Sequence, residues 1–337
     1  MFLQTSDLRT ESPQLMTYDM TELQRERRMG AIGTESTREV RRISLADLST
    51  RRTEIADELW SAATDIGFFQ VVDHGIDLTE VRRAFAMAEA FFALPAEVKA
   101  RYPKRFNSGW ESMTQVRPSV GTPDQKESYQ VTLSNMDGLW PSDDELVGFT
   151  DTIKAFEAKC WRLAMDLLSL FAEKMGFHRD FFAAAHDPTS ATYQSTLRLL
   201  HYFAVPQDVE PTGKWRAGAH TDFDCLTLLF QRNGQGGLQV CPGKEMDSQE
   251  WTSVEPSDHA ITCNIGDMLM RWSDDVLPSN FHRVRSPGAG DDRGARYSIA
   301  FFAQANSEVV IEGPSGKYPP ITAKDYLHQR ISANFAK

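Results

Sequence analysis

The chain has 337 residues and a formal net charge of −11, with a pI near 5.3. Hydrophobic residues make up 41% and charged residues 25%, which is the composition of an ordinary globular protein with a large core. Binding to nucleic acid or to an anionic membrane would need basic patches, so the acidic balance argues against both. A small molecule remains as the expected partner.

The first predicted segment, residues 1–40, is polar and charged. It is expected to be a mobile extension or a flap docked on the main body, and to be dispensable for folding. A helix is predicted next over residues 53–66, because its apolar residues share one face and Gly67 suits a helix end. The aromatic and β-branched residues 68–72 then predict a buried strand.

A second helix is predicted to begin with Thr79 as its N-cap and to end before Pro95. Residues 105–140 are rich in Gly, Pro, Ser and Gln, so loops and short strands are expected there. Apolar residues at alternating spacings of three and four from Phe149 to Met175 predict one long amphipathic helix that closes at Gly176. This helix is expected to support the whole fold.

From Leu197 onward, turn signals separate short apolar segments, a pattern typical of a β-barrel or jelly roll. The predicted strands are Leu197–Phe203, Leu226–Gln231, Leu238–Val240, Ala260–Ile265, Met268–Trp272, His282–Arg285 and Tyr297–Ala303. The expected organisation is a mixed helical region over residues 41–190, a jelly-roll core over 191–310 and a tail with a helix over 311–337.

The sharpest motif is His220-Thr221-Asp222. Residues two apart on a strand point to the same side, so this imidazole and this carboxylate can share one metal ion. Two histidines and one carboxylate on one face of an octahedron leave open positions, the arrangement of non-haem iron(II) oxygenases. A third ligand is therefore required.

A second copy of the pattern, His178-Arg179-Asp180, follows the long helix and precedes an alanine-rich segment. Helical geometry there would turn its two side chains roughly 200° apart at about 100° per residue, so it is rejected as a ligand pair. The third ligand is expected to be His282, which strand alternation places on one face with Val284. Competing candidates are His201 and His259, and any single histidine also fits a satisfied polar role.

Arg296 and Ser298 share a strand face fourteen residues after His282. A guanidinium fork with a hydroxyl suits the carboxylate of a ligand that chelates the metal, although a salt bridge at the rim is the alternative. Arg293 is a nearby rival, but it lies in a predicted loop.

These residues resemble the isopenicillin N synthase-like family of iron(II)/2-oxoglutarate-dependent dioxygenases. Seven ordered elements carry the resemblance: Gly67–Gly75, Leu197–Tyr202, His220–Asp222, Gly236–Val240, Gly266–Leu269, His282–Val284 and Arg296–Ser298. The resemblance implies a mainly β protein with flanking helices, whose core is a double-stranded β-helix (jelly roll) supported by a long helix. It also implies an oxidoreductase. Four widely spaced cysteines without a CxxC pair, and the lack of a membrane-spanning apolar stretch or a secretory signal pattern, predict that the protein is cytoplasmic.

The resemblance further implies that His220, Asp222 and His282 bind Fe(II). Arg296 and Ser298 would bind the distal carboxylate of 2-oxoglutarate, and Tyr202 matches a tyrosine that also reaches it in many members. Oxidative decarboxylation of 2-oxoglutarate with O2 then yields succinate, CO2 and an oxidant that abstracts hydrogen from a substrate, most often to hydroxylate it. His74 belongs to a structural motif of the family and is not expected to bind iron.

Within the family the chain is most similar to thymine 7-hydroxylase-like members. It departs from them in having Ser195 where they carry asparagine and Phe223 where they carry tyrosine, which argues against thymine. Phe223, Ser195 and Phe302 are the candidate substrate contacts, with a hydrophobic substrate face expected. Core packing explains Phe302 equally well.

Two other functions are compatible with the same residues. An oxidase like isopenicillin N synthase keeps the arginine and serine but needs no 2-oxoglutarate, and stoichiometric succinate release would distinguish the two. A jelly roll that binds a metal or ligand without catalysis is the other, because fold does not fix function. The substrate and the oligomeric state have no sequence signal.

Overall fold

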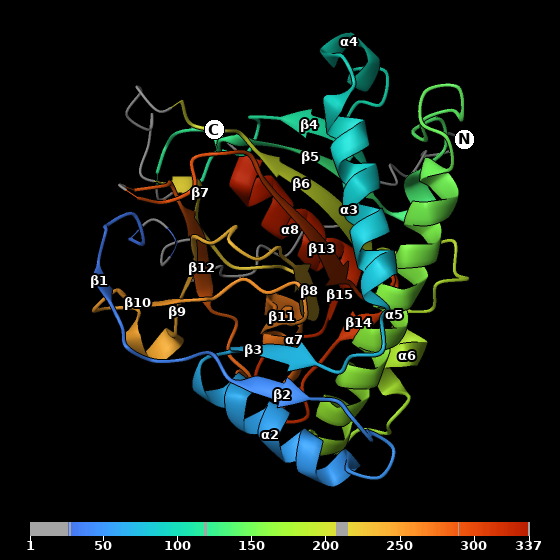
Figure 1. The fold of residues 1–337 in the computed structure, drawn as a ribbon. Coiled ribbons are helices and arrows are strands. Elements are labelled where there is room, and N and C mark those ends of the chain that lie inside the picture. Colours follow the sequence, from blue (N-terminus) through green and yellow to red (C-terminus); the bar gives the residue numbers. More distant parts are fainter. Residues whose placement is uncertain (1–25, 27, 118–119, 207–214, 289, 336–337) are drawn as a thin grey trace, which may run out of the picture.

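Two β-sheets face each other in the computed structural model, which describes residues 26, 28–117, 120–206, 215–288 and 290–335 (Figure 1). The larger sheet contains, in spatial order, β2 (Arg42–Ser44), β3 (Phe68–Val72), β11 (Ile261–Ile265), β8 (Leu226–Phe230), β13 (Arg296–Ala303), β6 (Thr196–Tyr202), β5 (Lys126–Val131) and β4 (Gly109–Ser112). The smaller sheet contains β1 (Thr34–Glu35), β10 (Glu250–Ser253), β9 (Leu238–Cys241), β12 (Phe281–Arg285) and β7 (Trp215–His220). A separate pair is formed by β14 (Val310–Ile311) and β15 (Ile321–Thr322).

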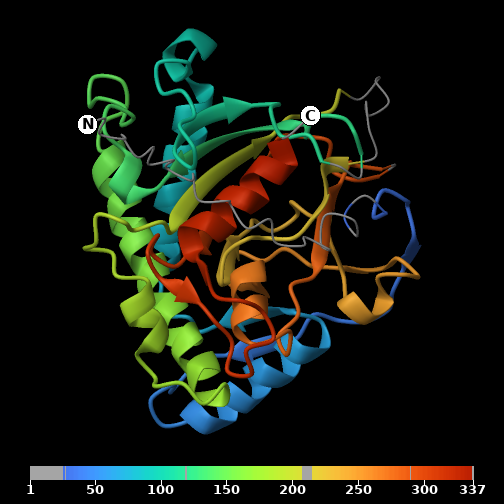
Figure 2. The same ribbon diagram turned by 180° about the vertical axis from the view of Figure 1, so that it is seen from behind.

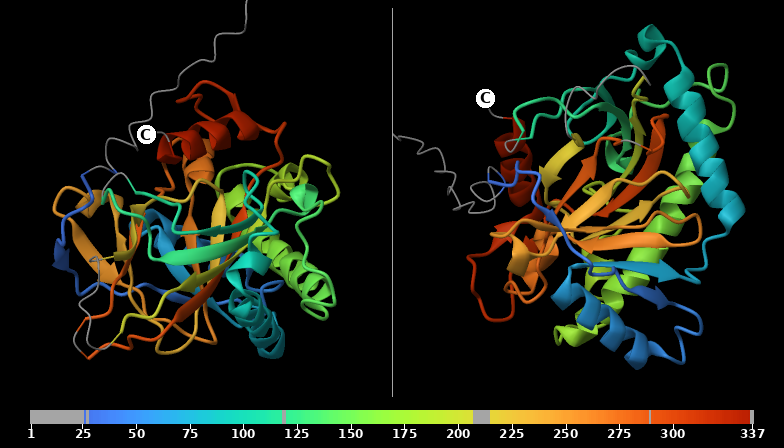
Figure 3. Two further views of the ribbon diagram at one scale, coloured as in Figure 1. Left: turned by 90° about the horizontal axis from the view of Figure 1, so that it is seen from above. Right: turned by 60° about the vertical axis from the view of Figure 1, so that its left-hand side comes forward.

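Three helices cover the outer face of the larger sheet, as Figures 1 and 3 show: α2 (Arg52–Asp65), α3 (Leu78–Ala93) and α5 (Phe149–Lys174). The shorter helices are α4 (Ala96–Lys99), α6 (Phe181–Ala185) and α7 (Asp267–Trp272), and the chain continues after β15 as α8 (Ala323–Phe335). The predicted fold class, a β jelly roll with flanking helices and one long supporting helix, is therefore confirmed.

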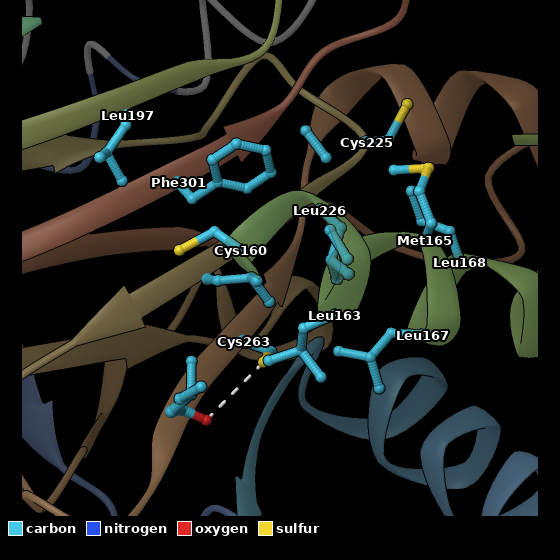
Figure 4. Packing of buried hydrophobic residues seen from close by; sticks show 14 of the residues in the cluster. Cys160, Leu163, Met165, Leu167, Leu168, Leu197, Cys225, Leu226, Cys263 and Phe301 are labelled. Carbon is cyan, nitrogen blue, oxygen red and sulfur yellow. Dashed lines mark hydrogen bonds between the residues drawn. The ribbon is translucent and has the colours of Figure 1, made fainter. Parts of the chain in front are cut away.

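Strand alternation divides the larger sheet into a helix-facing side and an inner side. Phe301 of β13 packs into the core around Cys160 and Leu163 of α5 (Figure 4). Its neighbour Ala300 belongs instead to a second buried cluster that includes Val284 of β12. Polar residues at the inner positions of β13 and β6 are consequently aimed at the space between the sheets.

A third layer covers the outer face of the smaller sheet. There β1 pairs in parallel with β10, and buried Met29 packs in one cluster with Trp251 and Phe281. The guanidinium of Arg283 lies 3.9 Å and 3.6 Å from the ring centroids of Trp215 and Trp251. It donates to the carbonyls of Ala31 and Ile32 at 2.9 and 2.7 Å.

Residues 28–40 of the predicted extension are thus docked on the smaller sheet, and we expect their removal to destabilise the fold. Residues 1–25 and 27 lie outside the described part of the chain.

The predicted N-terminal and jelly-roll regions share one sheet. β5 pairs with β6 from Lys126 opposite Tyr202 to Val131 opposite Leu197, and β11 pairs with β3. The mixed region therefore contributes strands to the same layer that carries the later site residues.

Two local predictions were wrong. The segment Met268–Trp272, predicted as a strand, forms α7, because short apolar runs do not distinguish a buried helix from a strand. The N-cap of α3 is Asp77 and not Thr79, since the Asp77 carboxylate accepts a hydrogen bond of 2.7 Å from the Thr79 amide. The strands β7 and β10 had no prediction.

All four cysteines are buried and unpaired. Among the described helices, none is long and apolar enough to cross a membrane.

Candidate metal centre

Three potential metal ligands meet at the inner face of the smaller sheet. His220 ends β7 and lies directly opposite His282 of β12 in the antiparallel pair. Asp222 lies in the connection that crosses from β7 to β8 in the larger sheet. Its Oδ1 atom is 4.0 Å from His220 Nε2 and 3.7 Å from His282 Nε2, and one ligand atom from each residue lies within 4.8 Å of the others.

Neighbouring groups hold the three side chains in the orientation that a metal requires. His220 Nδ1 is 2.8 Å from the Gly218 carbonyl, and His282 Nδ1 is 3.4 Å from that of Asn280. Both Nε2 atoms therefore point inward as acceptors.

Hydrogen bonds to the Oδ2 atom hold the carboxylate of Asp222 in place. Asp222 Oδ2 accepts hydrogen bonds of 2.7 Å from the Thr227 hydroxyl and 2.9 Å from the Asn264 amide. This arrangement leaves Oδ1 directed toward the histidines.

Electrostatics keep the two imidazoles in the form that binds metals. Burial lowers the pKa of His220 well below its ordinary value, and the charges of Arg117 and His282 add to that effect. Burial also lowers the pKa of His282, although Asp222 opposes it. Two neutral imidazoles with one carboxylate oxygen form the donor set expected for a mononuclear iron(II) centre.

An inner cavity between the sheets joins these ligands to three other predicted residues. Arg296, Ser298 and Tyr202 line the same cavity as His220 and His282. Buried Arg296 lies with its guanidinium carbon 4.8 Å from the Tyr202 ring centroid, and its Nη1 is 3.5 Å from Ser298 Oγ. The structure therefore brings together all six residues that sequence reasoning assigned to metal and co-substrate.

Sequence reasoning missed the residue that orients Arg296. The Gln235 carbonyl accepts a hydrogen bond of 3.0 Å from Arg296 Nε, and its side-chain oxygen accepts one of 2.8 Å from the Tyr297 amide. Gln235 follows the turn Asn233-Gly234, which predicted only a change of chain direction. Its role depends on pairing across about sixty residues, so no local signal could have revealed it.

An outer cavity lies on the other side of the metal ligands. His220, Asp222 and Phe302 line it as well as Phe223. Leu327 and Ile331 of α8 close one of its walls, and Figure 2 shows α8 lying across this face of the jelly roll.

Ser195, the third predicted substrate contact, does not line either cavity. It is buried, and its hydroxyl is engaged with the backbone of Gln304 at 3.1 and 3.2 Å. Gln304 itself lines the outer cavity, so Ser195 contacts a residue of the cavity wall and not the cavity.

The rejected histidines lie elsewhere. The side chains of His178 and Asp180 are 80% and 73% exposed, and His259 is exposed as well. His201 faces the helices, where its Nδ1 is 2.9 Å from Glu127. His74 Nδ1 accepts from the Ile76 amide at 3.2 Å.

Arg330 joins α8 both to the start of α7 and to Thr221, which lies between two of the potential metal ligands. Arg330 Nη2 is 2.8 Å from Asp267 Oδ2 and donates to the Thr221 hydroxyl at 2.9 Å. The Asp267 amide donates to the carbonyl of Asp222 at 2.8 Å. The guanidinium carbon of Arg330 is also 4.7 Å from the ring centroid of Phe223.

Comparison with known proteins agrees with this geometry. Residues 193–305 match the model of the 2OG-Fe(II) oxygenase superfamily, and residues 40–145 match a model described as the N-terminal region of non-haem dioxygenase in morphine synthesis. The 2-oxoglutarate-Fe(II) type oxidoreductase hxnY of Emericella nidulans is 32% identical over 80% of this chain and 82% of its own length. Proline hydroxylase buaE of Petromyces alliaceus is 32% identical over 81% and 89%, respectively.

Among solved structures, the full-length thymine 7-hydroxylase of Neurospora crassa in complex with alpha-KG and thymine superposes with a TM-score of 0.77. It is 30% identical, with 87% of this chain and 96% of that chain covered. The chain thus belongs to the 2OG-Fe(II) oxygenase superfamily and is a non-haem iron dioxygenase that uses 2-oxoglutarate.

Proposed function

We propose that this dioxygenase hydroxylates a small organic molecule bound in the outer cavity, against Phe223 and Phe302. The supporting observation is that the inner and outer cavities share His220 and Asp222. A co-substrate between the sheets and a substrate under α8 could therefore reach the same metal ion from two sides.

In this proposal His220, Asp222 and His282 hold Fe(II). Arg296 pairs with the distal carboxylate of 2-oxoglutarate, with Ser298 and Tyr202 as additional donors. Burial of Arg296 and its fixation by Gln235 support this role, because an oriented guanidinium binds a carboxylate in two places with little loss of side-chain freedom.

When bound, Fe(II) and 2-oxoglutarate supply the chemistry that turns O2 into an oxidant, with succinate and CO2 as products. The chain contributes orientation and the exclusion of water. Thr227 and Asn264 aim the Asp222 carboxylate, and the backbone carbonyls of Gly218 and Asn280 aim the two imidazoles.

The test is a turnover screen of the iron-loaded protein with pyrimidines, amino acids, phenolics and terpenoid acids. Hydroxylation predicts one succinate per product and one atom of labelled O2 in that product. Product without succinate would establish the oxidase alternative. If the protein bound iron and 2-oxoglutarate but consumed no O2 under any condition, it would be a non-catalytic binding protein.

His282→Ala tests the ligand assignment, because it should abolish turnover and greatly lower the iron content without unfolding the preformed jelly roll. His178→Ala, at the exposed copy of the motif, is the matched control and should change neither. Full activity of His282→Ala would refute the assignment.

We also propose that the protein belongs to the isopenicillin N synthase-like branch and works in a reducing cytoplasm. The order of the seven sequence elements supports the branch, and four buried thiols support the compartment. Cell fractionation would test the location.

A further inference from the structure

The outer cavity contains a cation that neither the metal nor the proposed 2-oxoglutarate site uses. Arg198 points inward from β6 and lines both cavities. Its guanidinium carbon lies 4.8 Å from the ring centroid of Phe302. In the register of β6 with β13 it is opposite Ala300, four residues from Arg296, which is about 14 Å along the strand at roughly 3.4 Å per residue. Arg198 is therefore separate from the proposed co-substrate anchor.

Arg198 has no direct carboxylate partner among the described residues. Its Nη2 donates to the side-chain oxygen of Gln130 at 2.7 Å, and the Gln130 amide donates in turn to Glu111 at 3.0 Å. Its Nε has no hydrogen-bond partner in the described part of the chain. The charge is oriented by Gln130 but is not neutralised by contact.

Glu111, a carboxylate whose charge acts on Arg198, already has several partners. Glu111 Oε2 is 2.6 Å from the Lys104 ammonium and accepts from the Thr114 hydroxyl at 2.6 Å. Glu111 Oε1 accepts three further hydrogen bonds, from Gln115, Ser128 and Gln130. Although burial opposes it, Lys104 and Arg198 lower the pKa of Glu111 to about 2. Glu111 is thus an ionised partner of Lys104 and cannot turn toward Arg198 without breaking these contacts.

Apart from Arg296, the proposed anchor of 2-oxoglutarate, the other cations that line the two cavities have carboxylate partners. Asp124 Oδ2 is 2.6 Å from the Lys126 ammonium and 3.3 Å from Arg117 Nε. Among the described residues that line the two cavities, the proposed metal ligand Asp222 is the only acidic side chain. The outer cavity therefore has an unmatched positive charge at Arg198.

Part of the outer cavity is apolar, with walls made by Phe106, Phe223, Phe302, Leu327 and Ile331, and polar side chains line the remainder. We propose that the organic substrate is a carboxylic acid with an apolar body, whose carboxylate pairs with Arg198 while the body packs between Phe302 and α8. A carboxylate is favoured over a neutral acceptor because a charge-assisted pair in a partly dry site is roughly twice as strong as a neutral hydrogen bond. The inference rests on the proposed function, since it names the substrate class of the same site.

The experiment compares carboxylic acids with their own primary amides, as pairs that differ in charge but hardly in shape. Aromatic and aliphatic monocarboxylic acids and the matching amides are added to the iron- and 2-oxoglutarate-loaded protein. Binding is measured by calorimetry without O2, and stimulation of succinate release is measured with O2. We expect acids to bind at least about tenfold more tightly than their amides.

Arg198→Gln should abolish the preference for acids, and Arg198→Lys should restore part of it. Arg232→Gln is the matched control, because Arg232 also lies over an aromatic ring, that of Phe85, but lines neither cavity. It should keep the full preference. Circular dichroism and melting curves of each variant establish that it is folded.

The inference is overturned if amides bind as well as acids to the wild-type protein, if no compound of either kind binds, or if folded Arg198→Gln retains the preference. Failure of the proposed function is recognisable separately, because the wild-type protein would then bind no iron or release no succinate from 2-oxoglutarate even without added substrate. Succinate release without a preference for acids would refute only the substrate class.

Discussion

Arg296 illustrates how one residue's surroundings define its expected role. Its guanidinium is buried, oriented by the carbonyl of Gln235 and close to Ser298 and Tyr202. A cation held in this way has lost its hydration, so it gains most from an anionic ligand that replaces the missing water.

Replacing this guanidinium should therefore affect 2-oxoglutarate selectively. Arg296→Lys keeps the charge but loses the planar fork, so the KM for 2-oxoglutarate should rise about tenfold to a hundredfold, by roughly 1.4–2.8 kcal/mol. Ser298→Ala and Tyr202→Phe remove one neutral contact each and should cost less, about 1 kcal/mol. Iron content, measured in parallel, should stay at the wild-type level.

An unchanged KM for 2-oxoglutarate in Arg296→Lys, with a raised KM for the organic substrate, would assign Arg296 to substrate binding. The co-substrate assignment would then be abandoned.

Glu157 is the residue on the scaffold whose ionisation should control stability. It is buried on α5, where the Tyr193 hydroxyl donates to it at 2.6 Å, and burial raises its pKa from 4.5 to about 7. A carboxyl with a raised pKa binds its proton more tightly in the folded protein than in the unfolded chain. Its contribution to stability is therefore lost as the pH rises from about 4.5 to about 7.

Glu157→Gln should remove this dependence because the amide does not ionise. Relative to that of the wild type, its free energy of unfolding should rise by on the order of 3 kcal/mol between pH 4.5 and pH 8, which makes the variant relatively more stable at high pH, as measured by urea denaturation. Glu173→Gln, at an exposed position near the end of the same helix, is the control and should lack this relative change. A constant difference between Glu157→Gln and wild type across the pH range would contradict the raised pKa.

At the scale of elements, a buried ion pair between Arg330 and Asp267 attaches α8 to the start of α7. Removing one partner of such a pair leaves a buried charge uncompensated, which typically costs about 3–5 kcal/mol. Arg330→Met should therefore lower the free energy of unfolding by this amount, whereas the double variant Arg330→Met with Asp267→Leu should recover part of the loss. Denaturant titration of the three proteins measures both effects, and equal stability of Arg330→Met and wild type would contradict this role.

Elements that depend on local pattern were predictable, and those that depend on distant partners were not. β13 and β12 contain β-branched and aromatic residues typical of strands, and successive side chains of a strand point to opposite faces, so the faces of Arg296, Ser298 and His282 followed from the sequence. β7 contains the small residues Ala217, Gly218 and Ala219, and it is a strand because it pairs with β12. The same limit applies to Thr227 and Asn264, the two residues that donate hydrogen bonds to Asp222. Asn264 comes from β11, about forty residues away, so no local pattern could have revealed it.

At the scale of the molecule, the N-terminal layer depends on a close approach at Gly33. Its φ is +66°, and a Cβ atom there would lie 2.1 Å from the carbonyl oxygen of Gln249 and 2.7 Å from the Trp251 ring. Gly316 has the same φ of +66° with nothing within 4 Å of its Cβ position. A substitution at Gly316 therefore measures backbone strain alone, whereas one at Gly33 measures backbone strain together with the steric clash.

Gly316→Ala should cost only the left-handed strain, roughly 1–2 kcal/mol. Gly33→Ala should cost roughly 1–3 kcal/mol more, because the segment must also move away from β10. Fluorescence of the buried Trp251 and urea denaturation would report undocking and lost stability. Equal destabilisation by both substitutions would mean that residues 28–35 can shift without penalty.

The division of the site between the two sheets has a consequence for how long the protein survives. His220 and His282 belong to the smaller sheet, whereas Arg296 and Ser298 belong to the larger one. A metal ion with 2-oxoglutarate bound to it would therefore connect the two sheets. A ligand that binds only the folded state adds about 2.7 kcal/mol to stability at a hundred times its Kd. When iron and 2-oxoglutarate are scarce, the sheets should separate more often and present their strands to proteases. The supply of iron and 2-oxoglutarate would then set the abundance of the protein as well as its rate.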